Sequence, residues 1–342
     1  MTKTRAAGRS VVAFLALMLI TVAATLSAAD AATAERQAGV LRLQVADEDG
    51  PFDVMVWYPT DAPQTPWQAG PFTIDASRDA PVAAQGRFPV VLFSHGSGGT
   101  PLGHRGLASS LARKGFVVVA PAHLGDTATR ARFEKQARIF TARPRQAMEA
   151  LQAALQDERL AGHVDPARIG MIGYSAGGYT ALALAGARLD ATAASTYCSG
   201  AGQGDIGSCG PAQDSVVDAI RQLRSARLAT EPRLKALVLM DPLSIVFDRV
   251  SLKEISLPIF LLRPEDDAYM NASHNALALA KGLSFPPQET VVPGRHFVFI
   301  DPCPQELAAE APLICNDEPS VDRAAVHEKF ESEIAAFLEK KL

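Results

Sequence analysis

A serine set between glycines is the residue of this chain best suited to covalent chemistry. Ser175 lies in Gly173-Tyr174-Ser175-Ala176-Gly177, a G-x-S-x-G pattern that follows an apolar run and precedes a run rich in alanine and leucine. This order predicts a buried strand, a sharp turn and a helix, a nucleophile elbow from which the serine Oγ projects. Glycines on both sides of the serine avoid collisions with neighbouring backbone. A plain strand–turn–helix with an incidental serine is the alternative.

A serine hydroxyl becomes a nucleophile when a base takes its proton and a carboxylate orients that base. His296 follows the last short strand that the sequence predicts, and in chain order the base of such a site comes last. His274 and His327 fall in predicted helices, so we expect both at the surface. His95 belongs to a glycine-rich turn, where we expect a structural role. His296 is therefore the predicted base.

Two aspartates fit the orienting acid, because each follows a predicted strand and neighbouring strand ends converge on one edge of the sheet. Asp267 follows the strand predicted at residues 257–262, which is the commoner location, and Asp241 follows the preceding strand. We favour Asp267 and keep Asp241 as the alternative. Asp266 is expected to point elsewhere as a solvated charge.

Attack on a carbonyl creates an oxyanion that needs preorganised donors. One predicted donor is the N–H of Ala176, directly after the nucleophile. The second comes from the turn at residues 95–99, after the apolar run 88–94, and is most plausibly the N–H of Ser97. A phosphate cradle is the alternative for this turn, but the G-K-[ST] ending of that motif is missing.

Apolar runs alternate with helix-forming stretches along most of the chain. Strands are predicted at residues 39–46, 52–58, 88–94, 116–120, 169–172, 234–240, 257–262 and 289–292, and helices at 102–114, 144–160, 214–228, 271–281 and 321–340. This alternation predicts an α/β domain with a mostly parallel sheet covered by helices on both faces. One domain over residues 36–342 accounts for the pattern.

Four motifs together resemble the α/β-hydrolase superfamily. They are F-S-H-G-S-G-G at 93–99, G-F-V-V-V-A-P-A-H at 115–123, G-Y-S-A-G-G at 173–178 and V-P-G-R-H-F at 292–297. From about residue 52 onward, the chain resembles bacterial dienelactone-hydrolase-like and platelet-activating-factor-acetylhydrolase-like enzymes. The resemblance implies ester hydrolysis without a cofactor. Dienelactone hydrolases themselves carry cysteine where Ser175 stands, which favours an ordinary serine esterase. The context of Asp267 resembles the first group and that of Asp241 the second.

The N-terminus has the pattern of a signal peptide. Basic Lys3, Arg5 and Arg9 precede an apolar run at residues 11–22, and A-x-A cleavage options follow at 29–31 and 32–34. We therefore expect a signal peptide over residues 1–31, cleaved within about 29–34, and a periplasmic or secreted protein. The apolar run is short for a membrane span, and an uncleaved anchor is the alternative.

The chain has four cysteines, an even number that suggests disulfides in an exported protein. Three pairings are possible. Sequence proximity favours Cys198–Cys209 and Cys303–Cys315, each of which closes a short loop. The spacings do not resemble a zinc site.

The composition excludes some functions and leaves three open. A net charge of −4 without a long single-sign block gives no indication of nucleic-acid binding, and the basic stretch 130–145 is interpreted as a solvated helix face or loop. No cofactor or metal is expected. The leading hypothesis is an exported serine hydrolase for small-molecule or lipid-like esters, with pockets shaped by residues 59–86 and 191–211. The alternatives are a peptidase or amidase and a non-catalytic binding protein of this fold.

Overall fold

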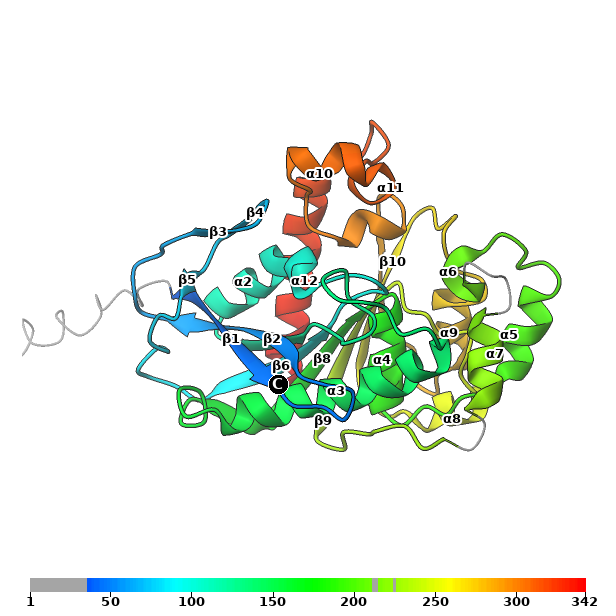
Figure 1. Cartoon of the computed structure of the whole chain (residues 1–342), viewed down its shortest axis with the longest axis horizontal. Helices are drawn as coiled ribbons and strands as arrows, with labels where there is room; N and C mark the ends of the chain where they lie inside the picture. Colours follow the sequence, from blue (N-terminus) through cyan, green and yellow to red (C-terminus); the bar gives the residue numbers. More distant parts are fainter. Residues whose placement is uncertain (1–35, 211–214, 224–225) are drawn as a thin grey trace, which may run out of the picture. The chain divides into compact units, whose positions relative to one another are not determined.

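A nine-stranded sheet organises the computed structural model of this chain, which describes residues 36–210, 215–223 and 226–342 (Figure 1). The strand order is β11-β10-β9-β8-β6-β7-β2-β1-β5. Strand β2 pairs antiparallel with β1 and β7, whereas β6 to β11 run parallel. The strands are β1 (Gln37–Val45), β2 (Phe52–Thr60), β5 (Ser77–Arg78), β6 (Phe88–Ser94), β7 (Val117–Pro121), β8 (Val164–Tyr174), β9 (Leu234–Met240), β10 (Ile259–Pro264) and β11 (Gln288–Val292). The predicted mostly parallel α/β sheet is confirmed.

Apolar cores lie on both faces of this sheet. Along β6, Val90 and Leu92 belong to one core, while Val91 and Phe93 belong to the other. Successive strand residues point to opposite faces, so a strand that is apolar throughout needs cover on both sides. Helices α3 (Gln136–Gln156) and α4 (Ala176–Leu184) contribute to the first core, and α2 (Arg105–Arg113) and α12 (Arg323–Lys341) to the second. Figure 1 shows α12 in red beside α2.

The remaining elements are short and connect or flank the sheet. They are the hairpin β3 (Trp67–Ala69) and β4 (Phe72–Ile74), the 3-10 helices η1 (Pro101–His104) and η2 (His296–Phe299), and the helices α5 (Ala191–Cys198), α6 (Ile206–Cys209), α7 (Ser215–Gln222), α8 (Arg249–Glu254), α9 (Ala276–Gly282), α10 (Gln305–Glu310) and α11 (Pro312–Cys315). Residues Arg36–Leu342 form one unit through their internal contacts. The predicted signal peptide lies outside the described residues.

Several helix boundaries differ from the predicted ones, and the starts of α3 and α9 differ most. Helix α3 begins at Gln136 and runs through Pro144, although proline is commonest at the first position of a helix. Helix α9 begins at Ala276, five residues after the predicted start at Asn271. The side-chain oxygen of Asn275 accepts hydrogen bonds from the N–H groups of residues 244 and 245, which holds the chain outside helical geometry before α9.

Both expected disulfides are present, Cys198–Cys209 and Cys303–Cys315. The described part of the chain has no free cysteine. Disulfides persist in oxidising compartments, so the two bonds are compatible with an extracellular or periplasmic protein. Among the described residues, none of the helices combines the length and apolar character that crossing a membrane requires.

Replacing both Cys303 and Cys315 by serine is expected to lower the free energy of unfolding by about 3 kcal/mol, because the bond closes a loop of about a dozen residues in the unfolded chain. Denaturant unfolding followed by circular dichroism measures the loss. The Cys198–Cys209 bond closes a loop of similar length, so replacing both of its cysteines by serine should lower the free energy of unfolding by a similar amount. Peptide mapping without reductant that found a 198–303 link would contradict the pairing.

Candidate active site

Ser175 lies in the turn between β8 and α4, as the sequence predicts. Its φ is 53° and its ψ −117°, a conformation that residues other than glycine rarely adopt and that is concentrated at functional sites. A Cβ at Gly177 would lie 1.8 Å from the carbonyl oxygen of Ser94, and one at Gly173 would lie 2.2 Å from that of Gly177. The close approach of three backbone segments therefore requires both glycines.

His296 begins η2, shortly after β11, and faces the serine. Its Nε2 lies 3.1 Å from Oγ of Ser175, and its Nδ1 lies 2.5 Å from Oδ2 of Asp241. The imidazole is buried, and burial lowers the pKa of His296 to about 4, so the ring is neutral at pH 7. With its proton on Nδ1, donated to Asp241, Nε2 is an acceptor for the serine hydroxyl.

Two tyrosines that the sequence analysis did not single out hold this imidazole in place. The ring of Tyr269 stacks on it with centroids 4.8 Å apart, and the ring of Tyr174 lies 5.1 Å away. The Tyr174 hydroxyl also donates to the carbonyl oxygen of His296 at 3.1 Å. Tyr174 occupies a variable position of the G-x-S-x-G motif, and Tyr269 belongs to no motif, so the sequence marked neither of them.

The carboxylate at Nδ1 of His296 belongs to Asp241, which corrects our preference for Asp267. Asp241 follows β9 directly, and its N–H donates to the carbonyl oxygen of Leu262 at 2.7 Å with φ at 44°. This turn directs the side chain toward the histidine. One oxygen of Asp267 instead accepts from the N–H of Met270 at 2.8 Å. Asp266 points away, as expected, and pairs with an arginine at the surface.

Asp241 and Asp267 nevertheless form a pair next to the imidazole. Among the described residues, Oδ1 of Asp241 and Oδ2 of Asp267 are buried and have no conventional donor. Burial, followed by the charge of Asp241, raises the pKa of Asp267 to about 8. Asp267 therefore keeps its proton at pH 7. Burial also raises the pKa of Asp241, to about 7, and the neighbouring Asp267 opposes that rise, so Asp241 is the member of the pair that ionises first.

The loop at residues 95–99 lies against the elbow. A Cβ at Gly96 would be 3.4 Å from the Cβ of Ser175. Within the described chain, the N–H groups of Ser97 and Ala176 donate to no protein acceptor, so both predicted oxyanion donors are available. Nδ1 of His95 bonds the carbonyl oxygen of Gly96 at 2.7 Å, and its Nε2 accepts from a backbone N–H. Burial lowers the pKa of His95 to about 3, so its ring is neutral at pH 7.

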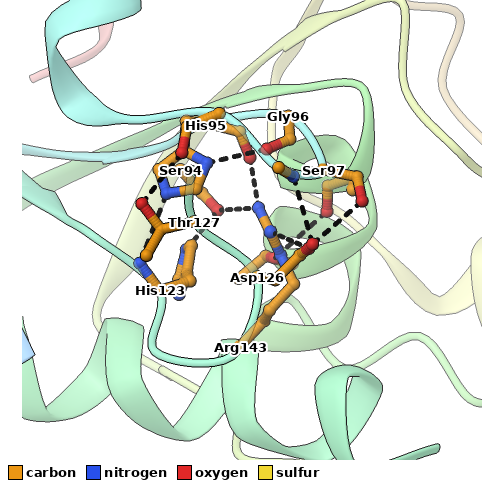
Figure 2. Close-up of polar contacts among 12 residues, drawn as sticks. Ser94, His95, Gly96, Ser97, His123, Asp126, Thr127 and Arg143 are labelled. Carbon is orange, nitrogen blue, oxygen red and sulfur yellow. Dashed lines mark hydrogen bonds and ion pairs between the residues drawn. The ribbon is translucent and has the colours of Figure 1, made fainter. Parts of the chain in front are cut away.

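A buried ion pair supports this loop from beneath (Figure 2). Oδ1 of Asp126 accepts from the hydroxyl of Ser97 at 2.9 Å and from the N–H of Gly98 at 3.1 Å. Its Oδ2 accepts from Nη1 of Arg143 at 2.6 Å, and Arg143 also donates to the carbonyl oxygen of His95. The pair therefore holds both ends of the segment that presents the Ser97 N–H.

The position of Arg143 corrects the interpretation of residues 130–145 as a solvated face. The Arg143 side chain is only 2% exposed, and burial lowers its pKa while the charge of Asp126 raises it. Arg132 also reaches Asp126, and Arg145 pairs with Asp47 at 2.8 Å. A buried arginine has no signature in the sequence, because only its partners in space distinguish it from its solvated neighbours.

Comparisons with known proteins agree with this geometry. A model of the dienelactone hydrolase family matches residues 74–204, which include the 95–99 loop and the elbow. The structure of ferulic acid esterase from Streptomyces cinnamoneus matches with a TM-score of 0.59 and 18% identity, covering 92% of each chain. The chain has the α/β-hydrolase fold. Over the matched segment it is similar to the dienelactone hydrolase family, which supports a hydrolase. A search of curated proteins finds no match.

A cavity of about 310 Å³ adjoins the histidine. Its lining includes His296, Tyr269 and Phe297, together with Pro312 and Leu313. The last two lie inside the loop closed by Cys303–Cys315. The sequence analysis treated that loop only as a disulfide segment, and the structure places it at the wall of a cavity beside the reactive residues.

The two segments that we expected to shape the pockets, residues 59–86 and 191–211, do not line the cavity beside His296. Residues 59–86 contribute Trp67, Phe72 and Arg78 to a larger cavity of about 670 Å³, which reaches Thr100, just beyond the 95–99 loop. From the segment 191–211, the N–H of Gly207 donates to the carbonyl oxygen of Tyr269 at 3.0 Å. The first segment therefore lines a cavity, and the second supports a residue that contacts the imidazole.

Asp267→Asn is expected to raise the melting temperature at about pH 7–8 and to change it little near pH 4. A carboxyl with a folded pKa of about 8 and an unfolded pKa of about 3.9 binds more protons when folded. Wild-type stability therefore falls as pH rises between those values. Asparagine does not titrate, and its N–H can still donate to Asp241.

Melting curves between about pH 4 and pH 9 measure this effect. Asp266→Asn is the matched control, since it removes a neighbouring carboxylate that is 61% exposed. A gain in melting temperature that did not grow with pH, or that Asp266→Asn reproduced, would contradict the assignment of a proton to Asp267.

Proposed function

We propose that this protein is an exported serine esterase with Ser175 as nucleophile, His296 as base and Asp241 as orienting acid. The observation that carries the proposal is the line of contacts from Ser175 Oγ to His296 Nε2 at 3.1 Å and from His296 Nδ1 to Asp241 Oδ2 at 2.5 Å. The match to the dienelactone hydrolase family supports a hydrolase of this general kind.

The chemistry has two halves that use the same groups. Oγ of Ser175 attacks the ester carbonyl carbon as Nε2 of His296 accepts the hydroxyl proton, and the N–H groups of Ser97 and Ala176 bind the oxyanion. The tetrahedral intermediate collapses, and the alkoxide leaves as an alcohol with the proton from Nε2. Water then attacks the acyl-enzyme while Nε2 accepts its proton, and Nε2 returns that proton to Oγ as the carboxylic acid departs.

Asp241 contributes by its position and charge. It accepts the Nδ1 proton of His296, which keeps the tautomer whose Nε2 can take the serine proton, and it stabilises the imidazolium that forms. Protonated Asp267 would donate a hydrogen bond to the other carboxylate oxygen of Asp241. Since that hydrogen bond leaves Asp241 as the ionised member of the pair, Asp267 would act as a positioning residue.

The substrate class proposed is a small ester with an apolar group. The cavity beside His296 is walled by Tyr269, Phe297 and Leu313. Arg295 and Glu318 also line it and pair with each other at 2.9 Å, so the lining suits an apolar acyl or alcohol group better than an anionic one. The structural neighbour, a ferulic acid esterase, agrees with ester chemistry. Within the described residues, we find no feature that favours a peptide substrate.

Export is proposed from the N-terminal pattern at residues 1–31 and supported by the two disulfides. The mass of the mature chain recovered from the periplasm or medium of an expressing bacterium tests this proposal. A full-length chain retained in the cytoplasm would contradict it.

Wild-type protein is expected to release a burst of p-nitrophenol from p-nitrophenyl butyrate, because acylation of Ser175 precedes slower deacylation. Ser175→Ala should abolish both the burst and labelling by a fluorophosphonate probe. Stopped-flow absorbance measures the burst, and circular dichroism checks that the variant folds. Labelling that persisted in Ser175→Ala would refute the assigned nucleophile, and faster turnover of aminoacyl anilides would favour a peptidase.

Paired asparagine variants test the assigned acid. Asp241→Asn should lower kcat by up to roughly 10⁴-fold, because the amide favours the wrong histidine tautomer. Asp267→Asn should keep most of the activity, since asparagine can still donate to Asp241. Steady-state kinetics on the same ester compare the two variants. A large loss in Asp267→Asn with a mild one in Asp241→Asn would restore Asp267 as the acid.

A further inference from the structure

A second cluster of titratable side chains lies outside the proposed active site. It consists of Asp301, which follows η2, and of His327 and Glu331, one turn apart on α12. One ligating atom from each residue lies within 4.8 Å of the others. We had expected His327 at the surface, but it is only 5% exposed. The proposed esterase mechanism uses none of the three.

The hydrogen bonds of His327 determine which ring nitrogen faces the carboxylates. Its Nε2 lies 2.8 Å from the carbonyl oxygen of Val298. A carbonyl oxygen can only accept, so Nε2 carries a proton. Nδ1 of the neutral ring then presents a lone pair to Oδ1 of Asp301 at 3.6 Å and to Oε1 of Glu331 at 3.5 Å. Three acceptors therefore converge on one point.

Asp301 has one oxygen in use and one without a partner. Its Oδ2 accepts from the N–H of Gly106 at 2.7 Å and lies 3.4 Å from Nη1 of Arg105. Its Oδ1 is buried and, among the described residues, has no hydrogen-bond partner. The side chain is 4% exposed. A buried carboxylate oxygen without a donor is costly unless a cation or proton compensates it.

We propose that Asp301, His327 and Glu331 bind a divalent transition-metal ion, with Zn²⁺ as the best match. Bonds of about 2.0–2.1 Å to nitrogen and oxygen place tetrahedral ligand atoms about 3.3–3.4 Å apart. The two separations at His327 Nδ1, 3.5 and 3.6 Å, are close to that spacing and longer than hydrogen bonds of about 2.7–3.2 Å. Imidazole with two carboxylates is a donor set that zinc accepts.

The surroundings allow an ion to enter and complete its coordination. A cavity of about 400 Å³ is lined by all three residues and opens to solvent, so water can supply a fourth ligand. The nearest fixed positive charge, Arg105, faces Oδ2 of Asp301 and not the converging Oδ1. The carbonyl of Val298 holds the imidazole in the ligating tautomer, as hydrogen-bonded partners of metal-bound histidines do.

Such an ion would join the segment that carries His296 to two helices. Asp301 lies five residues beyond His296, and through Gly106 it also contacts α2, while the other two ligands belong to α12. The ion would therefore stabilise the position of this segment. The inference does not depend on the proposed function, because the residues that hold the ion are separate from Ser175, His296 and Asp241.

The test uses untagged protein treated with a chelator and titrated with Zn²⁺ by calorimetry and by thermal melting. We expect one ion per chain and a rise in melting temperature of roughly 5 °C at a hundredfold excess over Kd. Glu331→Gln removes one ligand charge near the surface and should weaken Kd by at least about tenfold. Glu328→Gln, on the same helix and lining the same cavity, should bind as wild type does.

A second comparison separates this cluster from the aspartate pair beside His296, which could also attract a cation. Zinc binding should persist in His296→Ala. Equal zinc affinity in wild type and Glu331→Gln, or binding lost in His296→Ala and kept in Glu331→Gln, would overturn the proposal. Equal zinc affinity in the two proteins is also the result expected if a second proton on His327, and not a metal ion, compensates the two carboxylates.

Discussion

The close approach of backbone segments at the ends of β6 and β8 is the constraint on which the active site depends. The carbonyl of Ser94 lies where a side chain at Gly177 would be, so β6, the elbow and α4 can meet only because that side chain is absent. This approach places the 95–99 loop beside Ser175, where, within the described residues, the N–H groups of Ser97 and Ala176 donate to no protein acceptor. Positive φ at Ser175 is the local cost of this geometry.

Buried charge maintains the geometry that close packing creates. Asp126 and Arg143 are almost fully buried and bind each other and the loop, so neither charge is left uncompensated. A buried pair is not in itself a strong source of stability. Its value here is that hydrogen bonds to Gly98 and His95 define one loop conformation. Burial acts similarly on Asp241 and Asp267, because it raises the pKa of Asp267 to about 8 and so limits the charge of two carboxyl groups that lie beside one imidazole.

The histidine has a different kind of support, since it lies on a segment and not in the sheet. Tyr174 binds its carbonyl oxygen and Tyr269 stacks on its ring. Farther along, Asp301 binds the N-terminus of α2, and the disulfide at Cys303 closes the adjoining loop. These contacts come from separate elements. Displacement of the imidazole would therefore require several of them to break together.

The sequence by itself determined the features that local sterics control. The elbow was predictable because only glycine fits at positions 173 and 177, the parallel sheet because β6 is apolar on both faces, and the disulfides because short loops bring their cysteines together. Only the tertiary structure decided between Asp241 and Asp267, since both follow neighbouring strands and the choice depends on which oxygen reaches Nδ1 of His296. It also decided that Arg143 and His327 are buried, because burial of a charged or polar side chain depends on partners that are distant in the sequence.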